Sequence, residues 1–198
     1  MSEGRELQVR LAEPSEYAAV GEITVQAYAG DGFLDDTEEY ADRLRDAAAR
    51  AAGAELWVAV HGSEHGSDVL GSVTYCPPGS TYRELASPGE GEFRMLAVSP
   101  VARGRGVGRA LVRQCFTRSR ELGFGELVIC SLDAMTPAHA LYRSMGFVRD
   151  DSLDWEPVPD VSLLAFRAPV GPAQGADNPA STASAASRRT SARPLPEG

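Results

Sequence analysis

The stretch Arg103-Gly104-Arg105-Gly106-Val107-Gly108 decides the predicted fold of this chain. It follows a strand-like apolar run at residues 95–98 and leads into residues 109–112, which favour a helix. Glycines let a backbone approach a ligand closely, and a helix N-terminus presents unpaired N–H groups and the positive end of its dipole. The segment therefore predicts a loop and a helix start that hold a pyrophosphate.

The glycine spacing argues against two common phosphate-binding loops. The dinucleotide pattern G-x-G-x-x-G would need its third glycine at Arg109. The Walker pattern needs a Gly-Lys pair, and all 19 basic residues of this chain are arginines. A different class of phosphate ligand is expected.

The segment resembles the acyl-CoA signature of the GNAT superfamily of N-acetyltransferases, Arg/Gln-x-x-Gly-x-Gly/Ala, through Arg103, Gly106 and Gly108. Two further family elements are present. A strand ending in Val-x-Pro stands at residues 98–100, and a Leu-Tyr-x-x-x-Gly-Phe element runs from residue 141 to residue 147. The motifs span residues 92–148, and the flanking elements extend the resemblance to about residues 6–168.

Alternating and helical apolar patterns predict the order of the elements. Strands are expected at residues 7–11, 55–61, 69–75, 92–98, 126–131, 147–148 and 161–166, and helices at residues 14–28, 37–52, 107–122 and 136–146. This order indicates an α+β fold. The resemblance implies a GNAT-like fold, with a mixed, mostly antiparallel central sheet of about seven strands flanked by about four helices and splayed between the fourth and fifth strands.

Composition bounds the domain organisation and the partners. Of the 198 residues, 43% are hydrophobic and 24% charged, as in globular domains. Residues 1–168 are expected to form the acetyltransferase domain, and the Pro/Ala/Ser-rich residues 169–198 a disordered tail. The formal charge of −9 argues against nucleic acid as a partner.

Neither a membrane nor a metal is expected as a partner. No apolar run is long enough to span a bilayer, and the polar N-terminus does not resemble a signal peptide, so a cytoplasmic protein is expected. The three cysteines, Cys76, Cys115 and Cys130, form no C-x-x-C pair. They are expected to be reduced thiols rather than disulfides or zinc ligands. The oligomeric state is left open, a homodimer included.

The resemblance implies acetyl-CoA as the co-substrate and assigns its binding residues. In the family, backbone N–H groups of the loop and helix start hold the pyrophosphate, and the pantetheine arm pairs with the preceding strand. Carried over to this chain, the cofactor-binding residues are Leu96, Ala97, Val98, Arg103, Gly104, Arg105, Gly106, Val107, Gly108, Arg109 and Ala110. Many relatives bind the arm with an Asn where this chain has Met135, so Ser131, Asp133 or Thr136 substitutes, or backbone groups alone hold it.

Two catalytic residues are implied by the same resemblance. Tyr142 stands where the family places a phenol near the thioester sulfur and is expected to be the general acid. Glu92 matches the glutamate that some members use to deprotonate the amine, directly or through water; an exposed ion pair with Arg94 is the alternative interpretation. His139 is expected on the surface of its helix. No basic neighbour of Cys130 would activate it for a covalent route.

The predicted function is therefore an N-acetyltransferase that moves an acetyl group from acetyl-CoA to a primary amine by direct transfer in a ternary complex. The alternative is a non-catalytic acyl-CoA sensor or interaction module on the same fold. The acceptor is expected to be a small-molecule or peptide amine. A cationic acceptor is favoured by an acidic loop that contains Asp31, Asp35, Asp36, Glu38 and Glu39. A solvated surface loop is the alternative interpretation of these residues.

Overall fold

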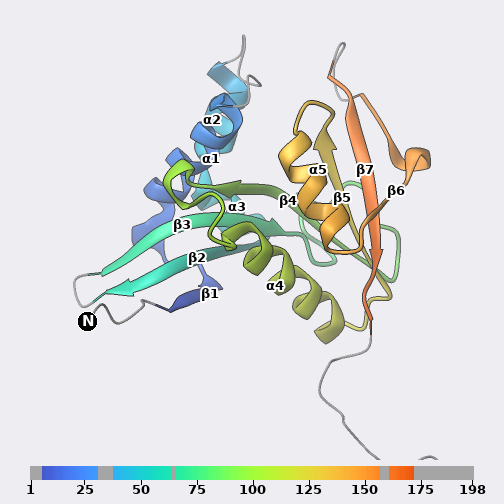
Figure 1. The fold of residues 1–198 in the computed structure, drawn as a ribbon, viewed down its shortest axis with the longest axis horizontal. Helices are drawn as coiled ribbons and strands as arrows, with labels where there is room; N and C mark the ends of the chain where they lie inside the picture. Colours follow the sequence, from blue (N-terminus) through green and yellow to red (C-terminus); the bar gives the residue numbers. More distant parts are fainter. Residues whose placement is uncertain (1–5, 31–37, 64–65, 157–160, 172–198) are drawn as a thin grey trace, which may run out of the picture.

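The computed structural model describes residues 6–30, 38–63, 66–156 and 161–171. They form a mixed sheet with the strand order β1-β2-β3-β4-β5-β7-β6 (Figure 1). Only β4 and β5 pair in parallel. The predicted α+β architecture is confirmed, and the strands are β1 (Leu7–Leu11), β2 (Glu55–Ser63), β3 (Gly66–Tyr75), β4 (Glu90–Val98), β5 (Glu126–Leu132), β6 (Val148–Arg149) and β7 (Leu163–Pro169).

Five α-helices lie within the described residues: α1 (Tyr17–Gly30), α2 (Glu38–Arg45), α3 (Ala47–Gly53), α4 (Val107–Glu121) and α5 (Thr136–Ser144). The first three lie behind the sheet in Figure 1 and α4 lies in front. The two-residue period of β2 explains this layering. Val58 and Val60 pack with Val20 of α1, whereas Ala59 belongs to the core that contains Leu111 of α4. None of the described helices is both long and apolar enough to cross a membrane.

The single helix predicted over residues 37–52 is wrong, because the structure divides it at Asp46. The Asp46 carboxylate accepts a hydrogen bond from the Ala49 N–H at 2.9 Å, which makes Asp46 the N-cap of α3. The break also brings the Arg45 carbonyl against α1. A Cβ on Gly21 would lie 2.4 Å from that oxygen, so only glycine permits this contact. The predicted cap at residue 37 lies outside the described residues.

β4 and β5 pair over only a short stretch. Three residue pairs join them, from Glu90↔Glu126 to Glu92↔Val128. Arg167 of β7 reinforces this junction by bonding Glu90 of β4 at 2.6 Å and Asp150 at 2.8 Å, and by pairing with Glu126 of β5. One guanidinium thus links both strands at the closed end of the sheet. Beyond it the strands separate, which confirms the predicted splay.

We expect Arg167→Gln to lower the free energy of unfolding by about 1–3 kcal/mol, because it leaves partly buried carboxylates without their cation. Urea denaturation at neutral pH measures the change. Arg113→Gln, at an exposed position of α4, should change stability by less than about 0.5 kcal/mol. Equal effects of the two substitutions would contradict the role given to Arg167.

Candidate active site

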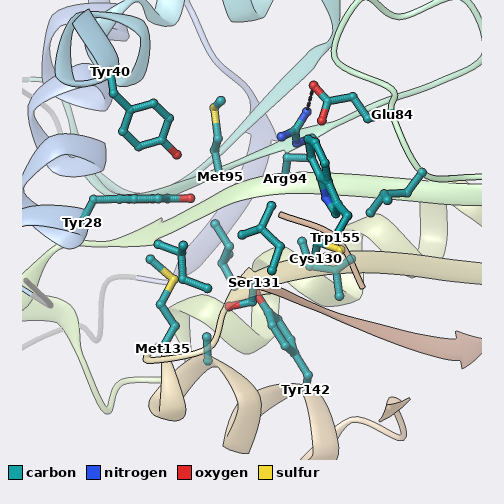
Figure 2. Close-up of a pocket in the computed structure, with 16 residues that line it drawn as sticks. Tyr28, Tyr40, Glu84, Arg94, Met95, Cys130, Ser131, Met135, Tyr142 and Trp155 are labelled. Atoms are coloured by element: carbon teal, nitrogen blue, oxygen red, sulfur yellow. Dashed lines mark ion pairs between the residues drawn. The ribbon is translucent and has the colours of Figure 1, made fainter. Parts of the chain in front are cut away.

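A pocket fills the space where β4 and β5 diverge (Figure 2). It is bounded on one side by α1 and α2, on another by the loop between β3 and β4, and on a third by α5. Its lining is apolar and aromatic apart from one ion pair and a few hydroxyls. The residues are Tyr28, Tyr40, Glu84, Leu85, Arg94, Met95, Leu96, Ile129, Cys130, Ser131, Leu132, Met135, Ala138, Tyr142, Trp155 and Leu163.

A β-bulge in β4 forms part of this pocket. The β3–β4 register passes from Thr74↔Arg94 to Ser72↔Ala97, so Met95 and Leu96 together oppose one residue of β3. Met95 has φ +51°, a left-handed conformation that a non-glycine residue rarely adopts. A bulge leaves one residue out of the ladder and redirects the strand. Here both bulge residues line the pocket.

The predicted pyrophosphate loop lies at the N-terminus of α4. Gly104 and Gly106 have φ values of +75° and +81°, and Gly106 is the N-cap. A glycine N-cap has no side chain to bond the first N–H groups of the helix, so these donors stay available. Gly108 differs, because a Cβ there would lie 3.2 Å from Leu141 of α5. It permits close packing of α4 against α5.

The Tyr142 ring sits in an aromatic cluster and is 3% exposed. Its centroid lies 5.9 Å from that of Phe93, 5.7 Å from Phe147 and 5.8 Å from Phe166. Burial raises the pKa of its phenol, so the hydroxyl stays protonated. Figure 2 shows this hydroxyl at the pocket end of the side chain. The arrangement provides a rigidly held proton donor.

Glu92 is fully buried and does not line the pocket. Its Oε2 accepts hydrogen bonds from the N–H groups of Leu85 at 2.9 Å and Ala86 at 3.0 Å, and the Glu84 N–H lies within 3.2 Å of both oxygens. The carboxylate therefore holds the loop before β4 in place. Its role as a base stays a prediction.

A charged pair in the pocket joins the loop that Glu92 holds to strand β4. Arg94 binds the Glu84 carboxylate at 2.6 Å, not that of Glu92 as the alternative interpretation expected. Arg83 fixes the same loop from the other side, donating to the carbonyls of Cys76, Ser87 and Glu90. Glu84 can turn to Arg94 because its carboxylate is on the pocket side, whereas that of Glu92 is enclosed by loop N–H groups.

Sequence reasoning missed several pocket residues. Tyr28 and Tyr40 pack edge to face at 6.3 Å, and their hydroxyls point into the pocket opposite Trp155 (Figure 2). They come from separate helices, so no local spacing in the sequence predicts that they meet. The acidic residues 31, 35 and 36 lie outside the described residues. His139 was wrongly expected at the surface: it is 3% exposed and its ring lies 4.9 Å from that of Phe166.

The chain matches the model of the acetyltransferase (GNAT) family over residues 20–147. It is 35% identical over 101 residues to an uncharacterized N-acetyltransferase of Schizosaccharomyces pombe, covering 51% of this chain and 57% of that protein. It is 32% identical over 126 residues to N-acetyltransferase 8 of Rattus norvegicus, covering 60% and 51%. The chain thus spans about half the length of these curated relatives.

Solved structures share the fold. A GNAT acetyltransferase of Staphylococcus aureus superposes with a TM-score of 0.64 at 13% identity, covering 84% of this chain and all of that one. An acetyltransferase structure from Salmonella typhimurium, solved with its cofactor acetyl-CoA, gives 0.58 at 21% identity, covering 87% and 98%. At these identities the likeness establishes the fold alone.

We expect Cys130, which lines the pocket, to be a poor nucleophile. Burial raises the pKa of its thiol from 9.0 to about 12, so the thiolate is scarce at neutral pH and increases only as the pH rises towards 12. At pH 8, iodoacetamide should alkylate native Cys130 at least about a hundredfold more slowly than free cysteine. Mass spectrometry follows the reaction, with the urea-unfolded chain as control. Rapid native labelling would contradict the assignment.

Proposed function

Since this chain belongs to the acetyltransferase (GNAT) family, we propose that it transfers an acetyl group from acetyl-CoA to a primary amine within a ternary complex. The observation that carries the proposal is the uncapped N-terminus of α4 beside the gap between β4 and β5. A phosphate-bearing thioester needs an anion site and an elongated slot. In the proposed site, the start of α4 would supply the first and the gap between β4 and β5 the second.

The residues present fit the co-substrate. A pyrophosphate would accept hydrogen bonds from the first N–H groups of α4, and the exposed Arg103 and Arg105 would add positive charge. Beyond Glu92, no strand in the described part of the chain pairs with the edge of β4 that faces β5. The backbone of residues 96–98 can therefore pair with the pantetheine amides as if with an added strand. The cofactor-binding assignment is proposed on these grounds.

The acceptor amine would enter from the side of the pocket lined by Tyr28, Tyr40 and Trp155. There Glu84 and Arg94 balance each other, so the described charges favour neither a cationic nor an anionic acceptor. Aromatic rings on this wall suit an apolar or aromatic body attached to the amine. We propose a small-molecule or peptide amine of this kind.

In the proposed reaction the neutral amine nitrogen attacks the thioester carbonyl carbon. The carbon–sulfur bond then breaks, and Tyr142 gives its proton to the departing thiolate. The amine proton leaves through water, which later restores the phenol. Of the two bases that the sequence left open, the geometry favours water, because the Glu92 oxygens already accept N–H bonds from residues 84–86.

We expect Gly106→Asp to abolish acetyl-CoA binding, because its carboxylate would face the pyrophosphate at the start of α4. Gly79→Asp is the matched control: both glycines have positive φ, +81° and +86°, and neither Cβ would meet an atom within 4 Å. Both variants should lose similar stability, and calorimetry should show lost binding only in the first.

If the natural chain is folded and binds no acetyl-CoA, the proposed function is wrong. If it binds but acetylates no amine in a broad panel, the non-catalytic sensor becomes the better interpretation.

We expect Glu92→Gln to raise KM for the amine about threefold to tenfold by loosening residues 84–86, while the pH profile of kcat/KM keeps its acidic limb. Steady-state kinetics between pH 6 and 9 measures both quantities. Glu121→Gln, at an exposed carboxylate of α4, is the control and should change neither. Loss of the acidic limb with a large fall in kcat would instead establish Glu92 as the base.

A further inference from the structure

The inward face of β5 ends in a polar residue that the core does not explain. Every second residue of this strand lies on the same face, which here holds Leu127, Ile129 and Ser131. Leu127 and Ile129 belong to the main apolar core. An apolar residue would continue the pattern. Ser131 interrupts this apolar pattern, although its side chain is only 5% exposed.

Among the residues that the structure describes, the Ser131 hydroxyl has no hydrogen-bond partner. An unpaired buried hydroxyl costs about 1–3 kcal/mol. Ser72 and Thr74 are also buried with unpaired hydroxyls, but neither of them lines the pocket as Ser131 does. Ser131 lines the pocket, and Figure 2 shows its hydroxyl and that of Tyr142 facing the space between the strands. Asp133 and Thr136, the other candidates near Met135, are exposed.

The register of the sheet places Ser131 along the gap. The last pair of the parallel junction is Glu92↔Val128, and three residues further along each strand come Met95 and Ser131. Met95 is the bulge residue with positive φ. Met95, Ser131 and Tyr142 of α5 all line the pocket, which thus brings together a distorted backbone on β4, a hydroxyl on β5 and a phenol.

We propose that Ser131 binds the sulfur of the coenzyme and donates a hydrogen bond to the thiolate as it leaves. The inference rests on the proposed function, in which Tyr142 protonates the same sulfur. Ser131 keeps its own proton throughout: the carbon–sulfur bond breaks, the thiolate is held by the Ser131 O–H, and the proton comes from Tyr142. Two donors on one atom offset the weak acidity of a buried phenol.

Coenzyme A and desulfo-coenzyme A, which lacks the sulfur, test this directly by calorimetry without any acceptor. Ser131→Ala should weaken coenzyme A binding about threefold to tenfold and leave desulfo-coenzyme A unchanged, and Ser131→Thr should restore binding. Ser72→Ala is the matched control, because Ser72 is also buried with an unpartnered hydroxyl but lies outside the pocket. Both alanine variants should be at least as stable as the natural chain.

Once an acceptor is found, Ser131→Ala should lower kcat about tenfold with KM for acetyl-CoA changed less than twofold. Its effect should be smaller in a Tyr142→Phe background, because both groups act on one sulfur. Equal weakening of coenzyme A and desulfo-coenzyme A, no weakening of either, or lower stability of Ser131→Ala would overturn the proposal. If the natural chain binds neither coenzyme, the proposed function itself fails.

Discussion

The parallel junction of β4 and β5 is the constraint on which the rest of the molecule depends. Its three residue pairs join two otherwise separate halves of the sheet, and Arg167 links the strands where they meet. A longer junction would pair β4 along its whole edge and fill the space that the pocket occupies. A weaker one would loosen the contact between Tyr142 and Phe93 of β4. The brevity of this pairing therefore creates the candidate site.

Polar groups around the gap fall into two classes with different physical consequences. Glu92 and Arg83 have their hydrogen bonds satisfied by the loop before β4, which stiffens the wall that carries Glu84. The N-terminus of α4 lacks a side-chain cap, and the Ser131 hydroxyl lacks a partner. The buried Ser131 hydroxyl costs folding free energy that a ligand would recover by bonding it. The exposed start of α4 carries no such cost, but its N–H groups and dipole favour an anion. The first class builds the site, and the second marks where a ligand is expected.

Burial explains why the Tyr142 phenol can act as a proton donor here while the Cys130 thiol cannot act as a nucleophile. The phenol of Tyr142 and the thiol of Cys130 both have raised pKa values, because a low-dielectric surrounding disfavours their anions. A protonated phenol can still donate, whereas a protonated thiol cannot attack. The same environment thus supports a direct transfer with Tyr142 as donor and opposes a covalent intermediate on Cys130.

The residues alone predicted the succession of strands and helices along the chain and the glycine loop before α4, because these depend on local backbone preference and short spacing. The splay of the sheet and the role of Tyr142 were implied by the resemblance to the family. The sequence did not predict the break at Asp46, where a side chain competes with the helix backbone for an N–H group. Long-range packing sets the pairing of Arg94 with Glu84, the enclosure of Glu92 by loop N–H groups, and the lack of a partner for Ser131 among the described residues. Each of these outcomes depends on which distant segments meet, and on how many donors and acceptors they bring, which local sequence does not encode.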